Sequence, residues 1–440
     1  MSAYLGDTLV TFGTFIDTEI NGIVQTYKVA AGESISAGDF VSWLNGKAEV
    51  GTDKQLSSTA NTIKRISAVS LNENKVFIAY GYGSAAYLYG VVCTFNGDTI
   101  TVGTETQLSN STNTGDVLSA VKLAEDKVFI AHRYDAYTLY AMVCTINGTT
   151  ITKGTDTPLN TTSNVAMNIK VASLSNSKVF VTYAYNSSDY ILYGVVCTIS
   201  GTTISVGANT QLSSILYTGR IMDVVVLDDS RVFIAHSYGN NYYLYGMVCT
   251  ITNTTIKAGT DTALDSSANN TGSKISAVLL SKDKVFIAHS STNYYLHGVV
   301  CTIDGTTMTT GKNIMLSTVT YSGAEISVAV LDEKRVFIAH SSDNTNRYLN
   351  GLVCSIDGTT ISVDAHTELN TTLIYSGTYI NALTITKDKL FVVHSGDSNY
   401  KLYGMVVPIS YGVTSLSDKI FGVAKTGGSE GKEIQVYVPG

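Results

Sequence analysis

Short apolar runs and polar turns alternate along most of the chain at a regular interval. In the first copy, the apolar runs cover residues 66–71, 75–80, 87–95 and 99–107. They are rich in Val, Ile, Tyr, Phe and Thr, which suit a pleated and half-buried surface. No segment has the spacing of an amphipathic helix. The pattern therefore predicts four short β-strands in each copy.

The spacing of the cysteines gives the length of the repeat. Their separations are 51, 53, 52, 52 and 53 residues, and the surrounding text Gly-Val-Val-Cys-Thr-Ile recurs with small changes. A further copy follows at 404–409, with Val407 in place of cysteine. Four strands in about 52 residues, with no helix, predict a β-propeller blade rather than a helical solenoid. The cysteines are Cys93, Cys144, Cys197, Cys249, Cys301 and Cys354.

Turn residues support the same strand assignment. An Asn-Gly or Asp-Gly pair separates the third and fourth runs at 96–97, 147–148, 304–305 and 357–358. These dipeptides tolerate positive φ and are a strong signal for a tight hairpin.

The order of the strands predicts how the ring closes. Residues 47–56 (KAEVGTDKQL) copy the fourth-strand text at 99–108 (TITVGTETQL), although they precede the first copy of strand one. The last copy supplies three strands, at 379–384, 389–394 and 401–409, and then stops. We therefore expect residues 47–56 to complete the last blade. The result is an all-β, seven-bladed propeller over residues 47–409, closed without free sheet edges.

Residues 1–46 and 410–440 lie outside the repeats. Residues 27–43 alternate between apolar and polar positions and contain the only tryptophan, and residues 419–438 read as two strands joined by a Gly-rich loop. Because the strands that enter and leave the last blade are neighbours, both ends must emerge side by side. We expect one small β-barrel built from both termini, with the propeller inserted between them.

The segments AGESISAGDFVSW and KIFGVAKTGGSEGKEIQVYVPG resemble the small β-barrel of bacteriophage head-decoration (capsid cement) proteins. The repeat text KVFIAHS and YYLYGMVCTI is similar to repeat proteins of phages and prophages of Gram-positive bacteria. The resemblance implies a virion protein on the particle surface, at the head, whose barrel binds capsid or other virion proteins. It also implies a homotrimer. The docking surface would include Phe40, Trp43, Ile420, Phe421 and Val423.

Composition narrows the partners. Charged residues make up 14% of the chain, the net charge is −7, and no basic stripe is present, so we expect no nucleic-acid partner. No apolar run approaches the roughly 18 residues of a membrane helix, so membrane insertion is not expected. The first residues lack the basic start and apolar core of a secretory signal.

The cysteines are expected to be buried packing residues. A disulfide needs Cα atoms within about 7 Å, whereas facing sheets lie roughly 10 Å apart. No C-x-x-C spacing points to zinc. Val407 at the seventh position indicates that the site takes a small apolar group, as buried free cysteine does.

A second repeated position ends strand two. Five histidines there could indicate a metal site or a pH switch. Two tyrosines at the same position favour packing and hydrogen bonding instead, so we expect no metal and no cofactor. The residues are Tyr80, His132, Tyr183, His236, His289, His340 and His394.

The hairpin between strands two and three combines tyrosine with Ser, Gly and Asn. This composition is typical of adaptable binding loops. Repeated on one rim, such loops could hold surface glycans or a partner with a multivalent gain. Alternatively, the tyrosines only cover the outer strands. The candidate residues are Tyr82, Tyr87, Tyr134, Tyr185, Tyr190, Tyr238, Tyr242, Tyr294, Tyr348 and Tyr400.

No Ser/His/Asp grouping, phosphate loop or paired-carboxylate motif stands out, so the sequence favours a non-enzymatic protein. The first hypothesis is a capsid-surface decoration protein anchored by the terminal barrel and displaying the propeller. The alternatives are a tail-associated receptor-binding adhesin for host attachment and a glycan-binding lectin.

Overall fold

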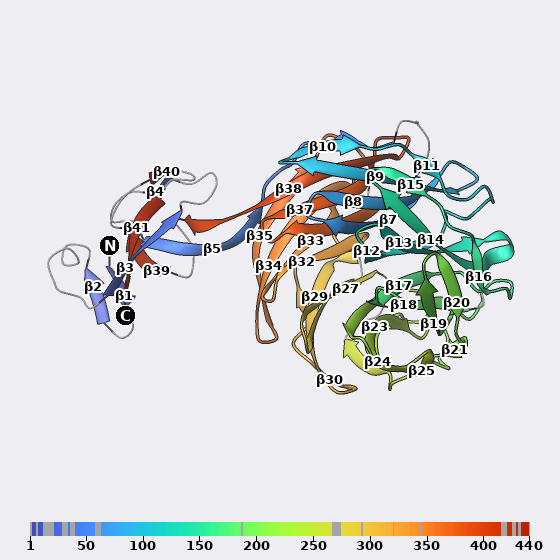
Figure 1. The fold of residues 1–440 in the computed structure, drawn as a ribbon. Coiled ribbons are helices and arrows are strands. Elements are labelled where there is room, and N and C mark those ends of the chain that lie inside the picture. Colours follow the sequence, from blue (N-terminus) through green and yellow to red (C-terminus); the bar gives the residue numbers. More distant parts are fainter. Residues whose placement is uncertain are drawn as a thin grey trace. The chain divides into compact units, whose positions relative to one another are not determined.

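The computed structural model describes residues 2–5, 8–11, 22–28, 34–35, 40–57, 63–185, 188–265, 274–291, 294–319, 321–342, 345–414, 420–424, 428–429 and 433–439. The chain divides into two compact units, Lys47–Ile409 and the pair Met1–Gly46 with Ser410–Gly440. The larger unit is a seven-bladed propeller of four-stranded antiparallel blades (Figure 1), which confirms the predicted all-β fold class.

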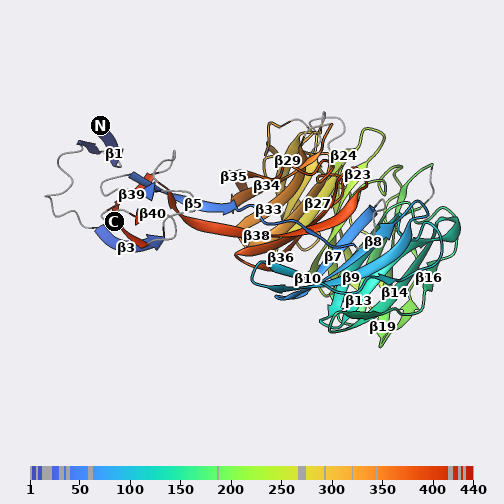
Figure 2. The ribbon, with the colours of Figure 1, turned by 90° about the horizontal axis from the view of Figure 1, so that it is seen from above.

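The first strand of each blade lies next to the propeller axis. Each of these strands contacts the first strands of both neighbouring blades, including the pair β36 and β7 that joins the last blade to the first. Figure 2 shows β36 close to β7. The first strands are β7 (Ile63–Asn72), β12 (Leu118–Ala124), β17 (Ile169–Ser175), β22 (Met222–Asp228), β27 (Ile275–Ser281), β32 (Ile326–Asp332) and β36 (Ile380–Thr386).

The second and third strands form the long central hairpin of each blade. The second strands are β8 (Lys75–Tyr82), β13 (Lys127–Tyr134), β18 (Lys178–Tyr185), β23 (Arg231–Tyr238), β28 (Lys284–Ser290), β33 (Arg335–Ser342) and β37 (Lys389–Gly396). The third strands are β9 (Tyr87–Asn96), β14 (Thr138–Asn147), β19 (Ile191–Ser200), β24 (Tyr243–Thr252), β29 (Leu296–Asp304), β34 (Tyr348–Asp357) and β38 (Lys401–Thr414). A 3-10 turn, η1 (Asp135–Tyr137), lies between β13 and β14.

The fourth strand is broken in five blades, whereas the sequence predicted one continuous strand. At the break in the first blade, Gly103 donates its N–H to Val92 O at 2.8 Å. A Cβ on Gly103 would lie 2.8 Å from that same oxygen, so only glycine allows this close approach. The pieces are β10 (Thr99–Val102) with β11 (Thr106–Gln107), β15 (Thr150–Thr152) with β16 (Thr157–Asn160), β20 (Thr203–Val206) with β21 (Thr210–Gln211), β25 (Thr255–Lys257) with β26 (Thr262–Asp265), and β30 (Thr307–Thr310) with β31 (Ile314–Met315).

The sixth blade keeps one long fourth strand, β35 (Thr360–Asn370). Asp364 stands where the other copies have the glycine. The register shifts here, because Val353 is opposite Ala365 and Cys354 is opposite Val363. Asp364 is therefore the extra residue of a β-bulge.

An early segment completes the seventh blade, as predicted. β6 (Lys54–Gln55) pairs with β38 through Gly404 and Tyr403. Leu56 donates its N–H to Leu402 O at 2.8 Å, and Glu49 donates to Pro408 O at 2.8 Å. The ring is therefore closed by backbone hydrogen bonds between segments more than 300 residues apart in sequence.

The core lies between adjacent blades. The second strand of each blade carries a fully buried phenylalanine, for example Phe77. A Cβ on Gly90 would lie 3.2 Å from the ring of Phe77, so the repeated glycine of the third strand makes room for the aromatic ring. Cys144 of the next blade packs in the same cluster as Phe77. All six cysteines are buried free thiols.

The smaller unit is built from both ends of the chain. β3 (Gly22–Lys28) pairs with β41 (Glu433–Pro439), which pairs with β39 (Ile420–Ala424). β39 also pairs with β5 (Phe40–Ala48). Two short pairs, β1 (Ser2–Leu5) with β2 (Thr8–Thr11) and β4 (Ser34–Ile35) with β40 (Gly428–Ser429), accompany them. Closure of these strands into a barrel stays a prediction.

Among the described residues, no helix has the length and apolar character needed to cross a membrane.

Candidate ligand-binding face

The hairpins between strands two and three share one face of the propeller with the loops that join each blade to the next. We call it the hairpin face. In the third blade, Tyr217 of the connecting loop donates its N–H to Asp189 O of the hairpin at 2.6 Å, and Gly219 donates to Tyr190 O at 2.6 Å. A Cβ on Gly219 would lie 3.0 Å from the Cα of Ala184, so glycine lets the loop backbone rest on the hairpin.

A channel opens on this face along the axis. Residues from the first strands of all seven blades line it, and its volume is about 430 Å³. Within the channel, polar side chains bind the backbone of the next blade. Ser67 Oγ accepts from the N–H of Ala120 at 2.9 Å, and Asn381 Oδ1 accepts from the N–H of Ala68 at 2.5 Å.

The same contact occurs at six of the seven blade junctions. The remaining acceptors are Ser119, Asp223, Ser276 and Ser327, which receive the N–H groups of Val171, Ala277, Val328 and Ala382. At the junction of the third and fourth blades, Lys170 replaces the small polar residue and pairs with Asp223 at 3.0 Å. The channel wall is thus held by polar contacts around the whole ring.

Tyrosines with positive φ recur in the hairpins and connecting loops on the face where the channel opens, a region that we call the channel mouth. At the last position of the hairpins, Tyr137, Tyr190, Tyr242, Tyr294 and Tyr400 have φ between 47° and 61°. In the connecting loops, Tyr217, Tyr321 and Tyr375 have φ between 59° and 66°. Bulky residues rarely adopt this left-handed region, whereas Gly and Asn do so readily.

The rings of the two sets meet in pairs. The centroids of Tyr294 and Tyr321 are 5.5 Å apart with nearly parallel rings, and those of Tyr375 and Tyr400 are 5.0 Å apart. The ring centroids of Tyr190 and Tyr217 are 6.4 Å apart, a looser stacking. The hairpin face therefore carries aromatic pairs at several blade junctions.

Eight of the ten predicted rim tyrosines fall into two groups. Tyr190, Tyr242, Tyr294 and Tyr400 belong to the positive-φ set at the channel mouth. Four others pack on a tyrosine of their own third strand, in the pairs Tyr82–Tyr89, Tyr134–Tyr140, Tyr185–Tyr193 and Tyr238–Tyr245. This second group covers the sheet. Tyr87 and Tyr348 begin the third strand, opposite Tyr82 and Ser342 in the register.

Two arginines lie among the aromatic rings. Arg133 is buried, its guanidinium lies 4.5 Å from the ring centroid of Tyr137, and Asp116 pairs with it at 3.4 Å. Arg220 is exposed, and its guanidinium lies 4.7 Å from the centroid of Tyr242 and 5.6 Å from that of Tyr190. It also donates a hydrogen bond to the hydroxyl of Tyr242.

The channel lining carries more positive than negative side chains. Arg65, Lys170, Arg220 and Lys274 face two carboxylates, Asp223 and Glu325. Lys274 pairs with Glu325 at 2.6 Å, and Lys170 pairs with Asp223. Among the described residues, Arg65 and Arg220 have no carboxylate partner.

The repeated aromatic position of strand two is fully buried and links strand two to strand four. Nδ1 of His132 lies 2.7 Å from Arg133 O, and Nε2 lies 2.8 Å from Asp156 Oδ1. Because a carbonyl oxygen only accepts, Nδ1 is the donor in the first of these contacts. His394 makes the same contact with Asp53 at 2.7 Å.

The other copies use related partners. Tyr80 donates to Glu105, Tyr183 donates to Asn209 at 2.6 Å, His289 contacts Asn313 at 3.0 Å, and His236 lies 2.9 Å from Asp261. These contacts support the predicted packing and hydrogen-bonding role. The part of the chain that the structure describes contains no cluster of three metal-binding side chains.

The sixth blade departs from this pattern. Its fourth strand offers His366, whose ring centroid is 5.3 Å from that of His340. Nε2 of His340 has no hydrogen-bond partner in the described part of the chain. Complete burial, together with the repulsion of His366, lowers the pKa of His340 to about 4.

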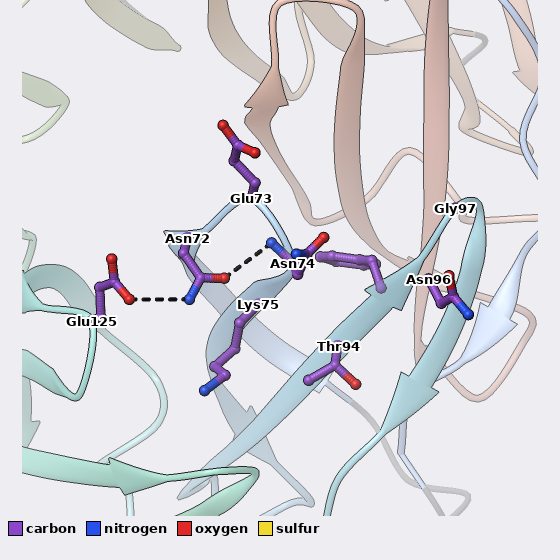
Figure 3. A pocket seen from close by; sticks show the side chains of 9 residues that line it. Asn72, Glu73, Asn74, Lys75, Thr94, Asn96, Gly97 and Glu125 are labelled. Carbon is purple, nitrogen blue, oxygen red and sulfur yellow. Dashed lines mark hydrogen bonds between the residues drawn. The ribbon is translucent and has the colours of Figure 1, made fainter.

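A groove on the opposite face is lined by turns rather than by tyrosines. Figure 3 shows Asn72 between its own turn and the neighbouring blade, where it donates to Glu125 at 3.3 Å and accepts from the N–H of Asn74 at 3.0 Å. Glu73, Lys75 and residues 94–97 complete the lining. The lining carries charged and amide side chains, and its aromatic residue, Phe95, packs on Phe391 with ring centroids 4.9 Å apart.

The predicted docking residues lie on two paired strands of the smaller unit. Phe40 and Trp43 belong to β5, and Ile420, Phe421 and Val423 belong to β39. Phe40 is opposite Val423 in the register, so the structure brings these segments together. Their side chains lie outside the described residues.

Sequence reasoning missed the arginines and the loop tyrosines. The loop tyrosines occur in a short repeated motif, Tyr-(Thr/Ser)-Gly, at 217–219, 321–323 and 375–377. In each copy the middle hydroxyl accepts a backbone N–H at the start of the third strand, as Ser322 does from Leu296 at 2.9 Å. The motif can therefore be found in the sequence, but its position beside the hairpin is known only from the structure.

No protein-family model and no curated protein matches the chain. Among solved structures, the BP39L lectin from Burkholderia pseudomallei has a TM-score of 0.61 at 10% identity, over 80% of this chain and 97% of that one. At this identity the likeness shows the propeller fold alone. An Aleuria aurantia lectin described as a six-bladed propeller has a TM-score of 0.43 at 11% identity, covering 72% and 99%. The NanB sialidase of Streptococcus pneumoniae has a TM-score of 0.45 at 13% identity, over 83% of this chain and 70% of that one. At these TM-scores the last two likenesses carry no argument.

Proposed function

We propose that this protein is a glycan-binding propeller, and that the hairpin face is its binding surface. The observation that carries the proposal is the set of tyrosines with positive φ around the channel mouth. Asn or Gly would suit the same backbone at lower cost. A bulky side chain held in an unfavourable conformation, at equivalent positions of several blades, is typical of a functional surface.

The chemistry of the face suits carbohydrate. Paired tyrosine rings offer flat apolar surface for the CH faces of a sugar, and their hydroxyls offer hydrogen bonds. Serine, threonine and asparagine of the same loops add further polar groups. Since the aromatic pairs recur around one ring, several weak sites could engage a branched or polymeric glycan at once.

The fold gives independent support, because BP39L, which shares the propeller architecture, is a lectin. The proposal includes no catalytic step. The predicted absence of enzymatic activity stays part of the proposal.

A glycan array with the full chain tests the proposal. We expect binding to a defined set of glycans, and loss of most of it in the double variant Tyr294→Asn with Tyr321→Asn, which removes one aromatic pair but suits the backbone. Tyr193→Phe, which keeps a ring on the outer sheet, serves as the control and should bind as the parent does. An array without any bound glycan, or full binding by the double variant, would contradict the proposal.

A second candidate follows from the smaller unit. Because β5, β39, β41 and β3 pair into one sheet from both termini, this unit is suited to anchor the propeller by both ends at once. With the resemblance to head-decoration proteins, this supports a role on the surface of a phage particle, at the head. The propeller would then present its hairpin face to glycans of the host. Immunogold labelling of particles tests the location, with label on the head expected and unlabelled particles contradicting it.

A further inference from the structure

The mouth of the channel contains an arginine that no carboxylate of the described chain neutralises. Arg220 is exposed and lines the channel, and within the described part of the chain its guanidinium donates a hydrogen bond only to the neutral hydroxyl of Tyr242. By contrast, Arg133 and Lys274 on the same face are paired with Asp116 and Glu325. Arg220 is therefore available to an anion from outside.

Neighbouring tyrosines hold this guanidinium in place. The rings of Tyr190 and Tyr242, from the hairpins of the third and fourth blades, have their centroids 5.6 and 4.7 Å from it. Both tyrosines have positive φ and end the hairpins of two neighbouring blades. Tyr217 stacks on Tyr190 and extends the aromatic surface. A cation held against aromatic rings loses little freedom when a ligand binds.

The excess positive charge of the channel lining favours a ligand with an acidic group. The channel lining has two more cationic than anionic side chains. Among the described residues, Arg65 and Arg220 are the two cations of this lining without a carboxylate partner. This local excess occurs in a chain whose net charge is −7. A planar guanidinium matches a planar carboxylate through two parallel N–H···O bonds.

We propose that the junction of the third and fourth blades binds the carboxylate of an acidic sugar. Arg220 pairs with the carboxylate, while Tyr190, Tyr217 and Tyr242 contact the sugar ring. Arg65, on the same channel mouth, adds long-range attraction for a second acidic residue of an oligosaccharide. This inference rests on the proposed glycan-binding function and specifies its ligand class.

Isothermal titration calorimetry on the full chain tests the site with two matched probe pairs. Sialyllactose is compared with lactose, and trigalacturonate with its carboxyl-reduced form. We expect at least one acidic probe to bind about tenfold more tightly than its neutral counterpart, the gain of a charge-assisted pair. Raising the salt concentration should reduce this preference.

Variants of the arginine then separate charge from geometry. Arg220→Gln should remove the preference for the acid, and Arg220→Lys should restore only part of it because the ammonium lacks the planar fork. Lys312→Gln removes one exposed charge away from the channel and should leave the preference intact. Thermal melting of each variant checks that the fold is retained.

The outcomes distinguish the two proposals. Equal binding of acidic and neutral probes, or a preference that survives Arg220→Gln, would overturn the acidic-sugar site while leaving a glycan-binding propeller. If neither these probes nor any glycan on the array binds, both proposals fail.

Discussion

Lys170 and Asp223 form an ion pair that joins two neighbouring blades through the channel wall. Nζ of Lys170 lies 3.0 Å from Oδ1 of Asp223, at the only junction where no small polar side chain receives a backbone N–H from the next blade. Oδ2 of Asp223 accepts the N–H of Ala277 at the following junction. One carboxylate therefore serves two junctions.

Removal of this carboxylate should weaken the propeller. We expect Asp223→Ala to lower the free energy of unfolding by about 1–3 kcal/mol, because the N–H of Ala277 and the ammonium of Lys170 both lose their partner. Asp223→Ser should recover part of the loss, since serine accepts the equivalent N–H in four other blades. Denaturant unfolding measures both variants, and equal losses for alanine and serine would show that the backbone contact contributes nothing.

The tyrosines at the channel mouth should be dispensable for stability. Tyr294 has φ of 59° and is 44% exposed. We expect Tyr294→Asn to change the free energy of unfolding by less than about 1 kcal/mol, because relief of backbone strain offsets the lost ring contact. Tyr245→Asn, in a β-strand and stacked 4.0 Å from Tyr238, should cost about 2 kcal/mol. A comparable loss for both variants would identify Tyr294 as a packing residue.

The sixth blade should make the protein sensitive to acid. The folded state lowers the pKa of His340 to about 4, below its ordinary value near 6.5. Between these two values the unfolded chain binds more protons than the folded chain. Stability is therefore complete above about pH 6.5 and falls as the pH decreases toward 4, by about 2 kcal/mol at pH 5.

His366→Asp tests this origin of the acid sensitivity. The variant gives His340 the carboxylate that His132 and His394 already have, so the imidazolium is stabilised in the folded state. We expect the difference in unfolding free energy between pH 7 and pH 5 to shrink. His297, whose pKa burial lowers to about 4, should account for part of the remainder. An unchanged pH dependence in His366→Asp would rule out His340 as the cause.

The cysteines should be inert in the native protein. All six are buried, and burial raises the thiol pKa, to about 12 for Cys93 and Cys249. Since the thiolate is the reactive form, we expect no reaction with Ellman's reagent at pH 8. Addition of guanidinium chloride should release six thiols per chain. Rapid labelling of the native protein would indicate that a blade opens locally.

The repeat itself carried most of the information about the fold. The propeller class, the number of blades and the closing segment at 47–56 followed from the period and the copied text. The break in the fourth strand was not predicted, because it depends on the close approach of Gly103 to Val92 O on the neighbouring strand. Such a contact leaves no periodic pattern in the sequence.

The candidate site was predicted only in part. Composition pointed to the tyrosines of the hairpins but could not distinguish Tyr242, at the channel mouth, from Tyr238, which packs on the sheet four residues earlier. The difference lies in the sign of φ, and this depends on the turn that ends the hairpin. Arg220 was missed because its aromatic neighbours come from two different blades.

The pairing of β6 with β38 affects the order in which the chain can fold during synthesis as well as the stability of the closed ring. During synthesis the segment at 54–55 leaves the ribosome long before its partner at 403–404 exists. Early blades can collapse in order, but the ring stays open until the last blade emerges, so the slowest step should be a single long-range closure. Once closed, separation of any one blade must break contacts with both of its neighbours, which should make the native ring resistant to proteases and slow to unfold.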